Sequence, residues 1–375
     1  MTRLRKKKAD VKVGLVCYKN TQKIVKTVLN PKSTEILQQP MFLGEDLGLQ
    51  RFDIIKYPEF KQLYEDQRGQ YWQPNEVPIS NDRAQFENMG EAERFVFVEN
   101  LLYQTGNDAL LSRTIEQLKH YVSNSELEFT MNWWGVMENT HSESYTYILQ
   151  NIVDEPSDFF EQIYTNKAVM ARINHLKSDF DRLLSPSKNV KEDIFKTVLA
   201  LQVAEGILFY VSFACSFWFG SRGVMKGNAD IIKLINKDEA LHVAITQNIM
   251  KRWKSDSSEG FQDIMAKNED LIYDTYKTAV KHEKEWANHL FSKGSLLGLN
   301  ADILHKYVEW LANIRLRSLG YNQIFETKKN PIGGWIDEYI SSGSTDPAPQ
   351  EKNILDYEKC KIKNDIDNID FDKLI

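Results

Sequence analysis

The chain has 375 residues, of which 42% are hydrophobic and 27% charged, so it has ample material for the core of one large domain or two. Its formal net charge is −6, with acids and bases mixed throughout, which gives no electrostatic argument for nucleic acid as a partner. Cys17, Cys215 and Cys360 are far apart and odd in number, so they indicate neither a disulfide framework nor a thiolate metal site and fit a reducing compartment.

The N-terminal residues are basic and are followed by two short alternating stretches, VKVGLVCY and TQKIVKTVL. The basic residues, from Arg3 to Lys8, are typical of a solvated end more than of a binding arm. No apolar segment after them is long enough to resemble a secretory signal, so we expect a cytoplasmic protein. The alternating stretches predict either a small hairpin or an extended arm in an N-terminal extension, residues 1–37.

Residues 40–77 are rich in turn-forming and aromatic residues, and Pro74, just after Trp72, disfavours helix nearby. From residue 91 onward, apolar residues recur at spacings of three and four, which predicts amphipathic helices. The predicted helices span residues 91–118, 125–154, 156–184, 190–221, 228–254, 261–291 and 300–319. The breaks between them contain Ser, Gly or Pro. We find no repeat or mid-chain linker, so a single helical domain is the simplest organisation.

Residues 206–221 form the longest uncharged run, bounded by Glu205 and Arg222. The run falls short of the roughly 18 to 20 apolar residues that span a bilayer, so we predict no association with a membrane. A helix that is apolar all round and lies outside a membrane is expected at the centre of a large bundle.

The chain changes character after Pro331, where apolar residues become sparse among charged ones. Such a segment cannot form a core of its own. It is either a segment that becomes ordered on a partner or a plain disordered end, and composition alone does not decide between them.

The segment FTMNWWGVMENTHSESYTYIL, residues 129–149, combines a carboxylate, an imidazole and a phenol. Glu138 and His141 are three residues apart, and His141 and Tyr145 are four apart, so on a helix all three side chains share one face. A second Glu-x-x-His pair, Glu239 and His242, occurs about a hundred residues later. One such pair is usually a surface feature, but two on separate helices indicate two metal ions.

Bundles that bind two metals add an acidic ligand from each of two further helices. Asp108 and Glu205 are the candidates, because each is an acid within an otherwise uncharged, largely apolar run. Two imidazoles and four carboxylates suit divalent iron or manganese and contain no sulfur for a structural zinc site. Iron is the leading candidate.

Tyr145 lies one turn beyond His141, where a metal pair that reacts with dioxygen would oxidise the phenol first. Phe209 and Phe213 share the face of Glu205, and Ile235 lies one turn before Glu239, so these apolar residues would shield a radical from water. Two other functions stay open from the residues alone. A di-iron oxygenase or desaturase would need an open substrate pocket at Phe209 and Phe213, and an iron-storage protein would be a shorter chain.

The sequence resembles the small, radical-generating subunit of class I ribonucleotide reductase. The resemblance rests on PMFLG near residue 40, YWQP, ENTHSESYT, EGILFYVSFACSF, IIKLINKDEALH and APQE in the tail, and it covers roughly residues 38–375. It implies an all-α, ferritin-like bundle with a di-metal carboxylate site over residues 38–335, and a flexible tail, residues 336–375, that docks to a large subunit. It also implies a homodimer that uses O2 and an external electron donor and supports reduction of ribonucleotides to deoxyribonucleotides.

The same resemblance implies two iron ions per chain, oxo-bridged when oxidised, although manganese could use the same ligands. Asp108, Glu138 and His141 would ligate one ion, and Glu205, Glu239 and His242 the other. Tyr145 matches the radical tyrosine. Trp72, Asp238 and His141 match a path for electrons. In the tail, Tyr357 matches a tyrosine that relays the radical to the large subunit, and Glu351 matches an acid associated with that relay.

Overall fold

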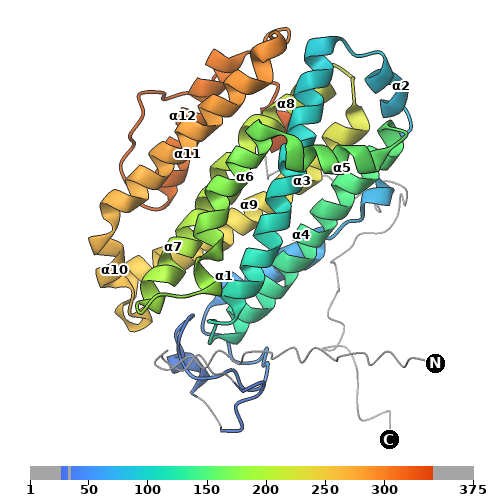
Figure 1. The fold of residues 1–375 in the computed structure, drawn as a ribbon. Helices are drawn as coiled ribbons and strands as arrows, with labels where there is room; N and C mark the ends of the chain where they lie inside the picture. The colour runs from blue at the N-terminus through green and yellow to red at the C-terminus, as the bar shows by residue number, and fades with distance from the viewer. Residues whose placement is uncertain (1–26, 33–34, 341–375) are drawn as a thin grey trace, which may run out of the picture.

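The computed structural model describes residues 27–32 and 35–340, which form a bundle of long helices (Figure 1). The α-helices are α1 (Pro58–Gln70), α2 (Asp82–Glu87), α3 (Glu91–Lys119), α4 (Ser125–Ile152), α5 (Pro156–Thr165), α6 (Lys167–Phe180), α7 (Val190–Val203), α8 (Tyr210–Ser221), α9 (Lys226–Ser255), α10 (Gln262–Lys267), α11 (Glu269–Leu290), α12 (Ala301–Ser318) and α13 (Asp337–Ile340). A π-helical turn, Ala204–Leu208, joins α7 to α8. Short 3-10 turns occupy Ile36–Gln38, Pro74–Glu76, Asp181–Leu184, Ser257–Glu259 and Phe291–Lys293. Within the described ranges there is no β-strand, only two isolated bridges.

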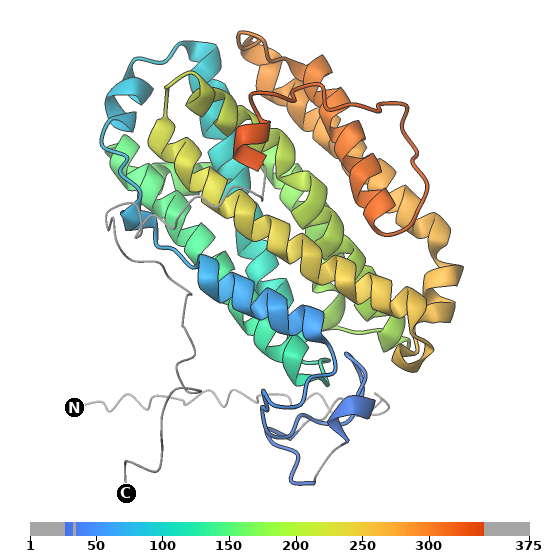
Figure 2. The same ribbon diagram turned by 180° about the vertical axis from the view of Figure 1, so that it is seen from behind.

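The long helices surround a core helix. α3 packs against α4 and α6, α9 packs against α8 and α1, and α11 pairs with α12 along one side of the bundle (Figures 1 and 2). Every residue of α8 from Tyr210 to Gly220 is buried. The continuous helical stretch Val190–Ser221 is, among the described residues, the one long and apolar enough to cross a membrane, and its most apolar window is entirely buried inside the protein. The prediction of an apolar helix at the centre of the bundle is therefore confirmed. The helical stretch begins at Val190, well before the uncharged run that starts at residue 206.

Helix α4 shows how local sequence fixes an element. Asn124 precedes the helix, and its side-chain oxygen accepts a hydrogen bond from the backbone N–H of Leu127, which satisfies one donor of the first turn. Glu126 and Glu128 place negative charge at the positive end of the helix dipole. At the other end, Val153 is extended, and the chain turns into α5.

Two of the predicted helices are each split at an asparagine. The one predicted for residues 156–184 is split at Asn166, whose side-chain oxygen accepts hydrogen bonds from the N–H groups of Ala168 and Val169 and so starts a new helix. The one predicted for residues 261–291 is split at Asn268, whose amide donates to the carbonyl of Ile264, four residues earlier. In both cases the asparagine side chain competes with the backbone for hydrogen bonds, which periodicity does not detect.

No helix was predicted in the turn-rich region from residue 40 to residue 77, but α1 lies within it. Pro58 opens α1 at its first position, where proline is well tolerated. Its buried residues are Phe60, Leu63 and Gln67. The amide of Gln67 donates to the carbonyl of Thr130 on α4 at 3.2 Å. The third buried position of α1 is therefore occupied by a polar residue, Gln67, so the spacing of apolar residues did not indicate a helix. The short helix α2 was not predicted either.

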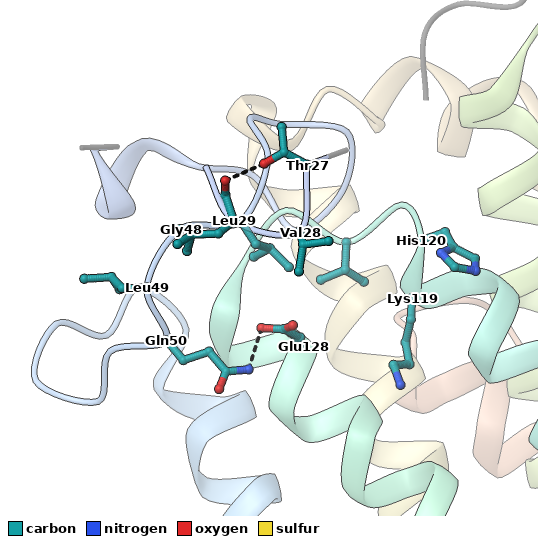
Figure 3. Close-up of a pocket in the computed structure, with 11 residues that line it drawn as sticks. Thr27, Val28, Leu29, Gly48, Leu49, Gln50, Lys119, His120 and Glu128 are labelled. Carbon is teal, nitrogen blue, oxygen red and sulfur yellow. Dashed lines mark hydrogen bonds between the residues drawn. The ribbon is translucent and has the colours of Figure 1, made fainter. Parts of the chain in front are cut away.

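The first described residues pack under one end of the bundle (Figure 1). Together with the ends of α3 and α4 they line a pocket of about 660 Å³ that includes Val28, Leu49 and His120 (Figure 3). Gln50 donates across it to Glu128 at 3.0 Å. None of the candidate metal ligands lines this pocket. The hairpin or arm predicted at the N-terminus falls mostly on residues 1–26, outside the described residues.

Candidate metal centre

The six candidate ligands lie on four helical segments and are all fully buried. These are Asp108 on α3, Glu138 and His141 on α4, Glu205 on the π-helical turn, and Glu239 and His242 on α9. The spacing of three residues in each Glu-x-x-His pair directs both side chains of that pair to the same side of the helix. The helices therefore bring together, in the core, acids that are distant in the sequence.

The ligand atoms form two overlapping groups. Within each group the atoms lie within 4.8 Å of one another, the first being Asp108, Glu138 and His141 and the second Glu138, Glu205, Glu239 and His242. Glu138 belongs to both. Glu239 also spans them, because one of its oxygens lies 3.3 Å from Nδ1 of His141 and the other 2.8 Å from Nδ1 of His242. The arrangement fits two cations with Glu138 and Glu239 between them.

Many of these buried atoms have no hydrogen-bond partner within the described part of the chain. They include both carboxylate oxygens of Asp108 and of Glu205, one oxygen each of Glu138 and Glu239, and Nδ1 of His141. Buried carboxylate oxygens without partners are costly, and such groups call for an ion or a proton. Oxygen and nitrogen donors without sulfur are the set that divalent iron or manganese accepts. The residues present therefore fit a metal pair.

The pKa shifts of the buried acids and of His242 also indicate a site for cations. Burial raises the pKa of Asp108 to about 7. Burial, followed by the charge of Glu205, raises the pKa of Glu138 well above its usual range, and burial with neighbouring Glu239 does the same for Glu205. Burial, then the charge of His141, lowers the pKa of His242 well below its usual value. The cluster therefore favours neutral, protonated acids until a divalent cation displaces the protons.

Asp238 links the cluster to a buried tryptophan. Nε1 of Trp72 donates to Oδ2 of Asp238 at 2.9 Å, and the same oxygen lies 3.0 Å from Nε2 of His141. Nδ1 of His141 faces the acids, so Asp238 orients the ring from behind. Burial alone would lower the pKa of His141, but the hydrogen bond to Asp238 and the charges of nearby acids raise it to about 9.

Tyr145 is 0% exposed, as are Phe209, Phe213 and Ile235. The rings of Phe209 and Phe213 stack with centroids 5.5 Å apart. Burial, followed by the adjacent charge of Asp108, raises the pKa of Tyr145 well above its usual value. The hydroxyl of Tyr145 is therefore protonated, shielded from solvent and close to the candidate ligand Asp108.

The sequence reasoning missed Trp134. Its Nε1 donates to Oε1 of Glu138 at 2.9 Å, and its ring stacks on the imidazole of His242 with centroids 4.9 Å apart. The signal was available, because Trp134 lies four residues before Glu138 and so shares its face of α4. With eight tryptophans in the chain, spacing alone did not distinguish it.

The structure does not place every predicted site residue. Tyr357 and Glu351 lie outside the described residues, as does the tail from residue 341 onward.

Comparison with known proteins gives a consistent result. The family described as "Ribonucleotide reductase, small chain" matches residues 51–331. The ribonucleoside-diphosphate reductase subunit beta of Haemophilus influenzae is 36% identical over 92% of this chain and 98% of that protein. The corresponding protein of enterobacteria phage T4 is 31% identical over 91% of this chain and 97% of its own length.

Solved structures share the fold. The ribonucleotide reductase R2 subunit from Clostridium botulinum superposes with a TM-score of 0.78 at 24% identity, covering 85% of this chain and all of that one. The dimanganese(II)-NrdF of Streptococcus sanguinis superposes with a TM-score of 0.65 at 20% identity, covering 78% of this chain and 98% of that one. At these identities the likeness establishes the ferritin-like, all-helical fold predicted from the sequence.

Proposed function

The chain belongs to the ribonucleotide reductase small-chain family, and on that premise we propose that it uses a pair of iron ions and dioxygen to generate a radical on Tyr145. As the small subunit of a ribonucleoside-diphosphate reductase, it works with a large subunit in ribonucleotide reduction. The observation that supports the radical most directly is the fully buried phenol beside a cluster of six buried donors.

Asp108, Glu138 and His141 would hold one ion, and Glu205, Glu239 and His242 the other. When bound, the two ferrous ions would supply electrons to dioxygen and give an oxidant next to Tyr145. The ligands suit manganese as well, and a similar solved structure is named as a dimanganese(II) protein. The remaining chemistry belongs to side chains of the chain itself.

Tyr145 must lose a proton from its hydroxyl oxygen when it loses an electron. The neighbouring carboxylate of Asp108 would receive it, which is supported by its charge being one of the causes that raise the pKa of Tyr145. Phe209, Phe213 and Ile235 are fully buried and would exclude water and reductants from the radical. The ring of Trp72, joined to His141 through Asp238, would conduct electrons between the centre and the protein surface.

The radical must then reach the large subunit. We assign this step to the predicted tail, residues 336–375, in which Tyr357 would relay the radical and Glu351 would assist. Its first residues are not flexible as predicted, because Ile336 is buried and α13 packs against α9. The working form would be a homodimer in the cytoplasm, reactivated by an external electron donor. Neither nucleic acid nor a membrane has a part in this proposal.

Substitution of Tyr145 by Phe tests the proposal against a di-iron oxygenase. The variant should take up iron like the wild type but lose both the tyrosyl signal in electron paramagnetic resonance and ribonucleotide reduction with the large subunit. A variant that still supports reduction at the wild-type rate would rule out Tyr145 as the radical site. Iron near two ions per chain, in place of thousands per assembly, would exclude storage.

A further inference from the structure

The ligand Glu205 lies in the π-helical turn Ala204–Leu208, between α7 and α8. Such a turn interrupts the regular ladder of hydrogen bonds and is often found at functional sites. The first turn of α8 that follows it also has N–H groups without partners inside the helix. The backbone around Glu205 therefore needs hydrogen-bond partners from elsewhere in the bundle.

One of these partners is Arg315, on α12. Its Nε donates to the carbonyl of Gly206 at 3.2 Å, and its Nη2 donates to the hydroxyl of Tyr210 at 2.7 Å. The guanidinium also lies over the ring of Tyr210, 5.3 Å from its centroid. A Cβ atom at Gly206 would lie 3.4 Å from Nε of Arg315, so the guanidinium approaches the backbone of Gly206 to van der Waals distance. Arg315 thus joins the residue next to Glu205 to the first residue of α8.

The first turn of α8, which follows the π-helical turn, is held from α11. The carboxylate of Glu283 accepts a hydrogen bond from the backbone N–H of Val211 at 3.3 Å. Glu283 is itself fully buried and paired with Arg172. Trp286, one turn further along α11, donates to the hydroxyl of Ser212 at 3.1 Å. The cationic Arg315 therefore contacts a backbone carbonyl, and the anionic Glu283 contacts a backbone N–H. Each charge matches the polarity of the backbone group that it contacts.

We propose that Arg315 is a positioning residue for the metal centre: by joining Gly206 to Tyr210 it keeps the π-helical turn open and holds the carboxylate of Glu205 in the cluster. Arg315 is not among the ligands, and it acts through the carbonyl of Gly206 and the hydroxyl of Tyr210. Relaxation of the turn toward a regular helix would rotate Glu205 relative to Glu239 and His242. The inference rests on the proposed function, because it takes Glu205 to be a ligand.

Arg315→Met removes both hydrogen bonds while keeping an apolar stem, and Arg317→Met, an exposed position on the same helix, is the matched control. Titration with Mn²⁺, followed by the resonance signal of the free ion, measures each affinity. In Arg315→Met we expect one of the two ions to bind about 10- to 100-fold more weakly, the usual effect of removing a group that orients a ligand. The control should bind both ions like the wild type.

Hydrogen exchange in the metal-free protein gives a second readout that does not depend on activity. The peptide covering residues 203–213 should exchange faster in Arg315→Met than in Arg317→Met. If Arg315→Met does not fold, Arg315→Lys retains the charge but cannot reach both acceptors, and it should show the same two changes to a smaller extent. Variants that match the control in both measurements would overturn the inference while leaving the proposed function intact. A wild type that binds no ion pair would refute both.

Discussion

One carboxylate oxygen of Asp238 contacts both the indole of Trp72 and the imidazole of His141. Removing the group that orients a ligand histidine typically weakens metal binding about 10- to 100-fold. We therefore expect Asp238→Ala to lower the Mn²⁺ affinity by that factor. Asp230→Ala, on the same helix and paired with Lys226 at the surface, is the control and should leave the affinity unchanged. Equal affinities in the two variants would argue against the role of Asp238.

The pKa of Asp108 gives a prediction with a defined sign. It is raised from 3.8 to about 7 in the folded protein, so between these values the folded state binds more protons than the unfolded state. The stabilisation is complete below the unfolded pKa and is lost as the pH rises through about 7. The metal-free wild type should therefore lose more thermal stability than Asp108→Asn between about pH 5.5 and about pH 8.

Thermal unfolding of both proteins, with and without Mn²⁺, measures this effect. Metal binding requires deprotonated carboxylates, so the stabilisation by Mn²⁺ should grow as the pH rises. An identical pH dependence in the metal-free wild type and in Asp108→Asn would contradict the raised pKa.

At the scale of single elements, the first turn of α9 packs against residues 78–79. A Cβ atom at Gly227 would lie 2.8 Å from Cα of Ile79 and 2.8 Å from the carbonyl oxygen of Pro78. Both of these atoms belong to the backbone and cannot move aside as a flexible side chain can. Gly227→Ala should therefore destabilise the protein by about 1–3 kcal/mol. Gly69, near the end of α1, has nothing within 4 Å of such an atom, so Gly69→Ala should be neutral or stabilising by up to about 1 kcal/mol. Denaturant unfolding compares the two, and a larger loss in Gly69→Ala would contradict the packing described.

The elements also show where sequence reasoning succeeds. Helices α3, α4, α9 and α12 begin and end within two residues of their predicted limits, because long apolar stripes and clear breaks define them. α1 was missed because Gln67 occupies a core position, where its amide bonds Thr130. The breaks at Asn166 and Asn268 depend on side-chain hydrogen bonds that periodicity does not report. The π-helical turn at Glu205 has no signature in spacing, and its hydrogen bond to Arg315 of α12 joins segments that are distant in the sequence.

At the scale of the whole molecule, the sequence predicted that six candidate donors would converge, because two Glu-x-x-His pairs and two acids within apolar runs match the ligand pattern of bundles that bind two metals. It could not predict that Glu138 and Glu239 would lie between the two groups, because this depends on how α4 and α9 cross. Trp134 escaped for a related reason, since its stacking on His242 joins two helices that are distant in the sequence.

The tail gives a prediction at the same scale. All six donors and Tyr145 precede residue 243, so deleting residues 351–375 removes none of them. The truncated protein should retain its metal content and its tyrosyl radical but lose activity with the large subunit, because Glu351 and Tyr357 are gone. Radical content and reductase activity, measured on the same preparation, test this. Loss of the radical would show that the tail supports the metal centre itself.

The position of the metal ions tests the central claim most directly. Anomalous diffraction at the iron edge, from crystals of the iron-loaded protein, locates each ion independently of activity. We predict two peaks per chain within the cluster, one near Asp108 and His141 and the other near Glu205 and His242, with Glu138 and Glu239 between them. A single peak, or peaks away from these side chains, would contradict the assignment of a di-metal centre.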